Sequence, residues 1–338
     1  MDATILGEQS AGTSAAVIDF LKSNTGFQQL AAAEGDAIIA RDLEDDEKLK
    51  AGVQLSVERG VLEAQEVPPR YTEIDVLGKT PDDVCEIILE NLGDAAKTGG
   101  VIILCGLSGT GKGTTVARLR TKYFPEGKAT SWSNGNVFRS LTLLAATWCE
   151  QQPEIVGFDA EKALTSQNLH SFMEMLTFGK FNGKWDIQIQ GLGISAFVSE
   201  IQNTDLKGPL VSKNIPTVAK QTQGEVVKFA ASAAQQMGAD GMIVLLEGRE
   251  ATVNYIPSKF RYTLSMSNPK LIGERRAAQR IAAGALIRLN SGECSTAASA
   301  ITTECEKLVS EITSRGSTQN RLVMLACGAA FVAAANFL

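Results

Sequence analysis

A glycine-rich segment that carries one lysine is the part of the sequence best suited to chemistry. It reads Gly-Leu-Ser-Gly-Thr-Gly-Lys-Gly-Thr-Thr over residues 106–115. Glycines let the backbone approach a ligand closely and adopt positive φ, so that successive N–H groups converge on an anion. Lys112 can reach the outer phosphates of a polyphosphate, and the hydroxyl of Thr114 or of Thr115 can ligate Mg²⁺. The spacing therefore predicts a phosphate cradle. Its expected residues are Gly106, Ser108, Gly109, Thr110, Gly111, Lys112, Gly113, Thr114 and Thr115.

The flanking sequence supports this prediction. Residues 101–105 are five apolar residues, the pattern of a strand buried on both faces of a parallel sheet. Val116 and Leu119 continue the segment as a helix, whose N-terminus adds a favourable field for anions. The order of strand, glycine-rich loop and helix distinguishes a phosphate loop from an accidental glycine-rich turn.

The next segment predicts a second group of polar side chains at the same edge of the sheet. A short strand is expected to end at residues 133–135, followed by a helix from Ser140 to about Glu150. Asn134 and Arg139 would then lie at the carboxyl edge, where open α/β sheets bind their ligands. Arg139 is suited to a bidentate grip on a phosphate, although a position on the helix surface remains open.

A second buried strand, over residues 241–247, ends in a carboxylate. Glu247 would lie beside the phosphate loop, where it can hold Mg²⁺ or its water shell, and Arg249 and Glu250 follow directly. A later helix, from about Leu271 to Leu289, is rich in arginine. Arg276 and Arg280 share one face of it, either as a lid that closes on phosphate or as a solvated basic face.

The remaining pattern predicts the other elements of an α/β fold. Thr80 and Pro81 are typical of a helix start, and the Asn-Gly turn within residues 178–190 indicates an antiparallel hairpin. The other expected elements are a helix around 14–22, a solvated acidic run at 41–50, a strand or two within 52–69, a loop at 208–216, a helix at 217–237 and a strand at 260–267.

Composition limits the partners. The chain has 338 residues, 44% of them apolar, and a formal net charge of −6. Residues 1–75 contain 15 acidic and 6 basic residues, a balance of −9, which leaves +3 for the remainder. A mildly positive remainder suits a small anionic substrate, and no basic nucleic-acid-binding surface is apparent. Six cysteines without a C-x-x-C pair, and a single histidine, His170, indicate reduced thiols in an intracellular compartment rather than a zinc site.

The two ends of the chain carry separate expectations. The amino end has no basic, apolar leader pattern, which favours a cytoplasmic location, and the protein is separately expected to be a monomer. Residues 322–338 contain no charge and as a helix would extend roughly 26 Å, so this segment could cap the fold or anchor it in a membrane. The expected organisation is an acidic extension at 1–75, an α/β phosphate-loop domain at 76–320 with an antiparallel insert at about 151–240, and an apolar helix at 321–338.

With these segments in place, residues 99–290 resemble the cytidylate kinase family, in its longer bacterial form with an inserted subdomain. Four segments carry the resemblance in the same order: Gly106-Leu-Ser-Gly-Thr-Gly-Lys-Gly-Thr114, Ser133-Asn-Gly-Asn-Val-Phe-Arg139, Glu247-Gly-Arg-Glu250 and Glu274-Arg-Arg-Ala-Ala-Gln-Arg280. The resemblance implies a P-loop nucleoside monophosphate kinase that uses ATP and Mg²⁺ to phosphorylate CMP or dCMP.

The same resemblance implies a role for each matching residue. Lys112, with Arg276 or Arg280, would stabilise the transferring phosphoryl group, and Thr114 would hold Mg²⁺ with Glu247 nearby. Arg139 and Arg249 would clamp the acceptor phosphate. The expected acceptor-binding residues are Asn134, Arg139, Arg249 and Glu250. Such enzymes rely on in-line positioning and charge neutralisation for most of their rate.

The sequence departs from the family at several positions. Asn134 stands where the family has a hydroxyl, Glu250 is one methylene longer than the family's aspartate, and the family's repeated Arg-Asp pairs are not recognisable after Arg280. Two alternatives therefore stay open. One is a nucleotide-binding scaffold without turnover, and the other is a kinase of a different small-molecule acceptor.

Overall fold

The computed structural model describes residues 3–314. The chain divides into two compact units. Unit 1 contains residues up to Arg41 and those from Met266 onward, whereas unit 2 contains Asp42–Ser265. One long helix, α3 (Thr25–Glu58), contributes residues to both units. Residues 42–75, expected to belong to an acidic extension, are thus part of the same unit as the phosphate loop.

Unit 2 is built on a five-stranded sheet in which every neighbouring pair is parallel, in the order β1-β8-β2-β7-β3. The strands are β1 (Thr72–Asp75), β2 (Gly100–Gly106), β3 (Ala129–Trp132), β7 (Ile243–Glu247) and β8 (Phe260–Ser265). The apolar run predicted as a doubly buried strand is β2, and it lies at the centre of the sheet. Ile102, Ile103 and Leu104 on β2 have no exposed surface, which explains why this strand has no polar alternation.

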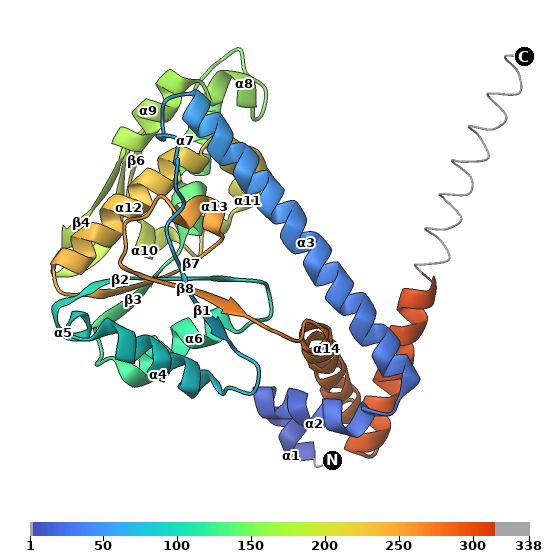
Figure 1. Cartoon of the computed structure of the whole chain (residues 1–338). Helices are drawn as coiled ribbons and strands as arrows, with labels where there is room; N and C mark the ends of the chain where they lie inside the picture. Colours follow the sequence, from blue (N-terminus) through green and yellow to red (C-terminus); the bar gives the residue numbers. More distant parts are fainter. Residues whose placement is uncertain (1–2, 315–338) are drawn as a thin grey trace, which may run out of the picture. The chain divides into compact units, whose positions relative to one another are not determined.

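Helices cover both faces of this sheet (Figure 1). On one face, α12 (Gln223–Ala239) packs Ala230, Ala234 and Met237 against Val101 and Ile103 of β2. On the other lie α4 (Pro81–Leu92), which starts with the predicted Thr80 cap, and α6 (Lys112–Arg118). The α/β fold class with a parallel sheet flanked by helices is confirmed.

A separate three-stranded antiparallel sheet, in the order β4-β5-β6, forms the predicted insert. Its strands are β4 (Leu176–Phe181), β5 (Lys184–Gly191) and β6 (Ile194–Phe197). Asn182 and Gly183 both have positive φ, as the tight turn between β4 and β5 requires. Ile187 and Ile189 point from β5 into a core shared with α7 (Asn134–Glu150) and α9 (Ser166–Glu174). The remaining short helices of unit 2 are α5 (Ala95–Thr98), η1 (Leu119–Tyr123), α8 (Ala160–Ala163), α10 (Val198–Ile201), η2 (Asp205–Lys207) and α13 (Glu250–Val253).

Two predictions about residues 208–237 were wrong. Of residues 208–216, expected to be a loop, all but Gly208 lie within helix α11 (Pro209–Gln221). Pro209 suits the first turn of a helix, and burial of Val211 and Val218 at helical spacing outweighs the cost of Pro216 in the interior. The predicted helix at 217–237 is divided, because the chain leaves α11 and begins α12 at Thr222.

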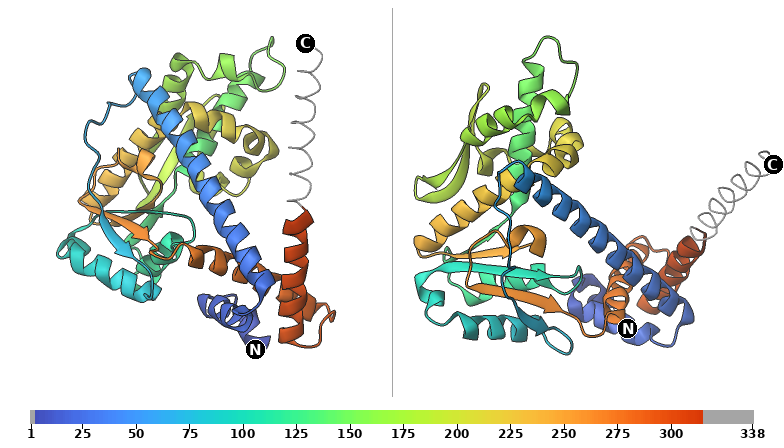
Figure 2. Two further views of the ribbon diagram at one scale, coloured as in Figure 1. Left: turned by 45° about the vertical axis from the view of Figure 1, so that its right-hand side comes forward. Right: turned by 45° about the horizontal axis from the view of Figure 1, so that its top comes forward.

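The strands expected within residues 52–69 do not occur. Helix α3 continues to Glu58, and in the described part of the chain the first strand is β1. The acidic run at 41–50 is therefore helical, and its Asp42 is only 1% exposed, which contradicts the expectation of a fully solvated segment. The carboxyl-terminal end of α3 packs against the start of α12 (Figure 2). Gly224 allows this approach, since a Cβ there would lie 2.5 Å from the Ser56 Cβ.

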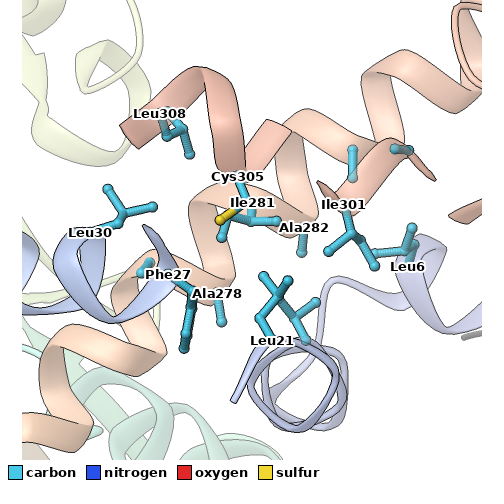
Figure 3. Packing of buried hydrophobic residues seen from close by; sticks show 14 of the residues in the cluster. Leu6, Leu21, Phe27, Leu30, Ala278, Ile281, Ala282, Ile301, Cys305 and Leu308 are labelled. Carbon is cyan, nitrogen blue, oxygen red and sulfur yellow. The ribbon is translucent and has the colours of Figure 1, made fainter. Parts of the chain in front are cut away.

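Unit 1 is a helical assembly with its own core. It contains α1 (Ala3–Glu8), α2 (Ala11–Leu21, matching the helix predicted around 14–22), the first part of α3, α14 (Lys270–Asn290) and helical residues 297–314. Leu21, Phe27, Ile281 and Ile301 point toward one another from these helices (Figure 3). Helices α3 and α14 approach closely at Gly273, where a Cβ would collide with the Ala31 carbonyl oxygen.

The apolar segment 322–338, expected either to cap the fold or to anchor it in a membrane, lies outside the described residues. Within residues 3–314 no helix combines the length and the apolarity needed to cross a bilayer.

Candidate phosphate-binding site

Three of the four functional segments predicted from the sequence lie at the carboxyl edge of the parallel sheet in unit 2. Strands β2, β7 and β3 are consecutive neighbours and run in the same direction. The glycine-rich loop therefore follows the central strand, Glu247 ends the next strand, and Asn134 begins α7 after the edge strand. This is the position at which α/β sheets of this type bind ligands.

The path of the loop depends on glycine at its first position. Gly106 has φ +130°, and a Cβ there would collide with the carbonyl oxygen of Leu264 on β8. Gly111, at φ +93°, caps the start of α6 in the left-handed region. Thr110 closes the turn between them, because its hydroxyl donates to the Leu107 carbonyl at 2.8 Å. The loop thus has the tight curvature that a phosphate cradle needs.

Lys112 lies inside the loop. Its Nζ donates to the carbonyl oxygens of Gly106 at 2.7 Å and of Leu107 at 2.9 Å. Burial, together with the charge of the Arg249 guanidinium, lowers the pKa of Lys112 from its ordinary value. The ammonium group therefore sits where it can exchange backbone carbonyls for phosphate oxygens.

The hydroxyl expected to ligate Mg²⁺ is better assigned to Thr114 than to Thr115. Thr115 is buried and its hydroxyl donates to the Gly111 carbonyl at 3.0 Å, whereas Thr114 is exposed. Glu247 lies nearby, since a Cβ on Gly113 would be 3.8 Å from its Oε2. Among residues 3–314, no cluster of three or more His, Cys, Asp or Glu could hold a metal by itself. Thr114 and Glu247 are thus the groups that could share a cation with a bound phosphate.

A carboxylate that sequence analysis missed is bound at this loop. Asp42 of α3 accepts a hydrogen bond from the Ser108 backbone N–H at 2.6 Å and from the Ser108 hydroxyl at 2.7 Å. Arg249, which follows β7, donates to the same carboxylate at 2.5 Å, and its Nη2 also lies 3.5 Å from the Ser108 hydroxyl. A guanidinium, an amide and a hydroxyl therefore converge on one anionic group.

Electrostatics keep this carboxylate ionised. Burial alone would raise the pKa of Asp42, but the hydrogen bonds from Arg249 and Ser108 outweigh it and lower the pKa to about 2. Asp46, one helical turn further along α3, places its Oδ1 3.6 Å from the Arg249 Nε. The Arg249 guanidinium is thus flanked by two carboxylates of the same helix.

The remaining acceptor-site residues show different environments. Asn134 accepts a hydrogen bond from the Trp132 indole at 2.8 Å. Arg139 turns back toward the start of its own helix and donates to Asn136 at 3.3 Å, whereas Arg249 reaches the loop. Glu250 is exposed at the first position of α13. Of the two arginines expected to clamp an acceptor phosphate, Arg249 is the one with a direct contact to the phosphate loop.

The two arginines expected in a lid belong to unit 1. Arg280 of α14 forms ion pairs with Glu34 of α3 and with Glu311, the latter at 3.8 Å. Arg276 lies 3.9 Å from Glu34 through its Nε. In this structure both guanidinium groups are therefore engaged by carboxylates of their own unit.

Within unit 2, buried polar contacts hold the carboxyl-terminal end of α3 against α11 and α12. Ser56, which has no exposed surface, accepts a hydrogen bond from the Gly224 N–H at 2.9 Å. Arg59 donates to the Gln221 carbonyl at 2.7 Å and pairs with the buried Glu225 at 2.8 Å. These contacts hold the helix that carries Asp42.

The buried stripe of α3 that includes Asp42 is visible only in the structure. Counting by helical steps of three or four residues from Gly52 and Ser56, both of which are buried, leads back to position 42. A carboxylate on such a stripe requires a cationic or hydrogen-bonding partner. From sequence alone the segment indicates a solvated face, because five of residues 42–47 are Asp or Glu.

Comparison with known proteins gives one partial match. No family model matches the chain. A protein named ABC-type transporter MDR1, from Aureobasidium melanogenum, is 34% identical over 151 residues, which is 43% of this chain. The match spans about a tenth of that protein's length.

Proposed function

We propose that unit 2 transfers a phosphoryl group from ATP, with Mg²⁺, to a nucleoside monophosphate. CMP or dCMP is the acceptor favoured by the sequence resemblance. The observation that carries the proposal is the meeting of a phosphate loop with Arg249 at the carboxyl edge of the sheet: Lys112 occupies the loop, and Arg249 reaches Ser108 from the neighbouring strand. In the proposal, Lys112 serves the donor phosphates and Arg249 serves the acceptor phosphate.

In this proposal, Lys112 leaves the carbonyls of Gly106 and Leu107 and binds the donor phosphates. The loop amides and the N-terminus of α6 stabilise the same negative charge. Arg249 holds the acceptor phosphate in line with the phosphoryl group that is transferred. Mg²⁺, when bound between Thr114, Glu247 and the phosphates, would neutralise charge that develops during transfer.

The partial similarity to an ABC-type transporter, a class of ATPase, supports ATP as the bound nucleotide. It does not bear on the identity of the acceptor. The polar side chains at the start of α7, which follows β3, support a small-molecule acceptor. Asn134 and Asn136 lie there and offer amide groups of the kind that can hydrogen bond a base.

The test is a coupled assay of the full chain with ATP, Mg²⁺ and each of the common nucleoside monophosphates. We expect turnover with at least one acceptor and a loss of about 100-fold or more in kcat for Lys112→Ala. Lys259→Ala, which removes an exposed lysine in the loop before β8, is the matched control and should retain full activity. Failure of every acceptor in wild-type protein would refute the kinase proposal.

One observation favours a second candidate, a nucleotide-binding protein without turnover. Arg249, the guanidinium needed for an acceptor phosphate, is held by Asp42 and flanked by Asp46. This alternative predicts ATP binding that is lost in Lys112→Ala and no acceptor-dependent ADP formation, which the same assay combined with calorimetric titration would reveal.

A further inference from the structure

The anion-binding groups of the candidate site are already assembled around a carboxylate of the protein itself. The Arg249 guanidinium, the Ser108 N–H and the Ser108 hydroxyl all donate to Asp42, at 2.5, 2.6 and 2.7 Å. Charged and amide donors of this kind are those that bind phosphate oxygens. Asp42 is separated from Ser108 by 66 residues in sequence, so this arrangement arises only through the fold.

We propose that Asp42 is an internal occupant of the phosphate-binding site between the loop and Arg249, which a substrate phosphate must displace before it can bind. The inference rests on the proposed function, because it takes Arg249 and Ser108 to be phosphate ligands. Asp42 is then an autoinhibitory group. The exposed opposite side of α3 is where a regulator could act on it.

Competition follows from the geometry. The Ser108 N–H has a single hydrogen, which Asp42 accepts, and the Arg249 Nη2 donates to Asp42 and lies near the Ser108 hydroxyl, so a phosphate oxygen that takes these donors must displace Asp42. Two anions placed side by side in a buried site also repel each other strongly. The ligand therefore binds only the fraction of molecules in which Asp42 has withdrawn, and its apparent affinity falls by that fraction.

Withdrawal is compatible with the way α3 is held. The anchoring contacts begin at Gly52 and Ser56, of which Gly52 lies ten residues (52 − 42) from Asp42, roughly 15 Å along a helix. Displacement of Asp42 therefore takes a rotation of its side chain or a bend of α3 between Asp42 and these contacts, because α3 is also packed on its other side, at Ala31 and Glu34.

The experiment measures binding rather than turnover, using calorimetric titration of CMP and of inorganic pyrophosphate into the full chain. We expect Asp42→Asn to bind both probes at least about tenfold more tightly than wild type. Glu47→Gln, which removes one charge from an exposed position of the same helix, should change the affinity by less than about twofold. Asp42→Glu keeps the charge and should remain close to wild type.

The outcomes separate this inference from the proposed function. Tighter pyrophosphate binding by Asp42→Asn without any kinase turnover would support the displaced carboxylate and refute the kinase. Equal or weaker binding by Asp42→Asn, or no pyrophosphate binding to either protein, would overturn the inference even if the kinase assay succeeded.

A second measurement does not depend on the folding of a variant. Saturating wild-type protein with the probe that binds should speed hydrogen exchange in residues 42–50, because the helix loses its contact with the loop. Unchanged or slower exchange there at saturation would contradict displacement.

Discussion

Gly106 shows how much of the site depends on a single backbone position. Its φ of +130° is one that side chains rarely adopt, and the Leu264 carbonyl occupies the space where a Cβ would be. The glycine therefore serves two purposes, since it permits the turn into the loop and lets β8 pass directly beside it.

We expect Gly106→Ala to lower the free energy of unfolding by about 3 kcal/mol or more, from strain and collision together. Gly111→Ala is the matched control, because Gly111 also has a left-handed φ but has open space around its missing Cβ. Backbone strain alone should lower the free energy of unfolding of Gly111→Ala by about 1 kcal/mol. Urea denaturation of both variants measures the difference, and equal losses would show that the collision with Leu264 is relieved at no cost.

Each residue of the phosphate loop could be predicted from the sequence, whereas Asp42, the carboxylate bound at the loop, could not. The spacing of glycines after an apolar strand is a local pattern, which can be recognised in the sequence without knowledge of the fold. The partnership of Asp42 with Arg249 joins positions 207 residues apart and depends on how α3 packs. For Arg139 the sequence left two environments open, and the rotamer that turns it toward Asn136 is a matter of side-chain packing.

At the scale of elements, the contact between α3 and α12 determines where Asp42 lies. Arg59 and Glu225 form a largely buried pair, and the second oxygen of Glu225 has no hydrogen-bond partner among the described residues. Removing one member of such a pair leaves an uncompensated charge, which is usually more harmful than removing both.

We expect Arg59→Met to lower the free energy of unfolding by about 3 kcal/mol. The double variant Arg59→Met, Glu225→Met should recover a large part of this loss, and Glu225→Met alone completes the cycle. Denaturant unfolding of the four proteins gives the coupling energy. A double variant as unstable as the sum of the single variants would mean that the pair does not act as a unit.

Sequence patterns predicted the positions of many helices and strands but assigned some segments to the wrong type of structure. Four strands of the parallel sheet and the Asn182-Gly183 hairpin followed from apolar runs and turn residues, whereas the edge strand β1 was not predicted. Helix α11 was missed because Pro209 and Pro216 are typical of loops, and only burial of one face shows that the segment is helical. Helix α3 was not predicted, and the burial of its carboxyl-terminal end depends on partners more than 160 residues away.

At the scale of the whole molecule, the described residues form two compact units that share one helix, and each unit has apolar clusters of its own. The core of unit 1 gathers small and branched residues from both chain ends, including Leu6, Ile281 and Ile301. The sheet core of unit 2 gathers Ile103, Val244 and their neighbours. Each core buries its own apolar surface and should respond separately to a cavity.

We expect Ile281→Ala to destabilise unit 1 by about 2 to 5 kcal/mol. Ile287→Ala, on the same helix but 69% exposed, is the control and should change stability by less than about 0.5 kcal/mol. Hydrogen exchange should accelerate in residues 270–290 of Ile281→Ala, with strand β2 little affected. Equal acceleration in β2 would show that the two units unfold as one.

The carboxylate held by Ser108 and Arg249 also has a consequence for selectivity. An intramolecular competitor is present at a high effective concentration, so weakly bound anions from the surrounding solution, such as free phosphate or sulfate, are excluded at rest. A nucleotide gains additional affinity through its base and sugar and can overcome this competition. The contact of Asp42 with Ser108 and Arg249 would in this way select ligands that bind the protein through further groups as well as through a phosphate.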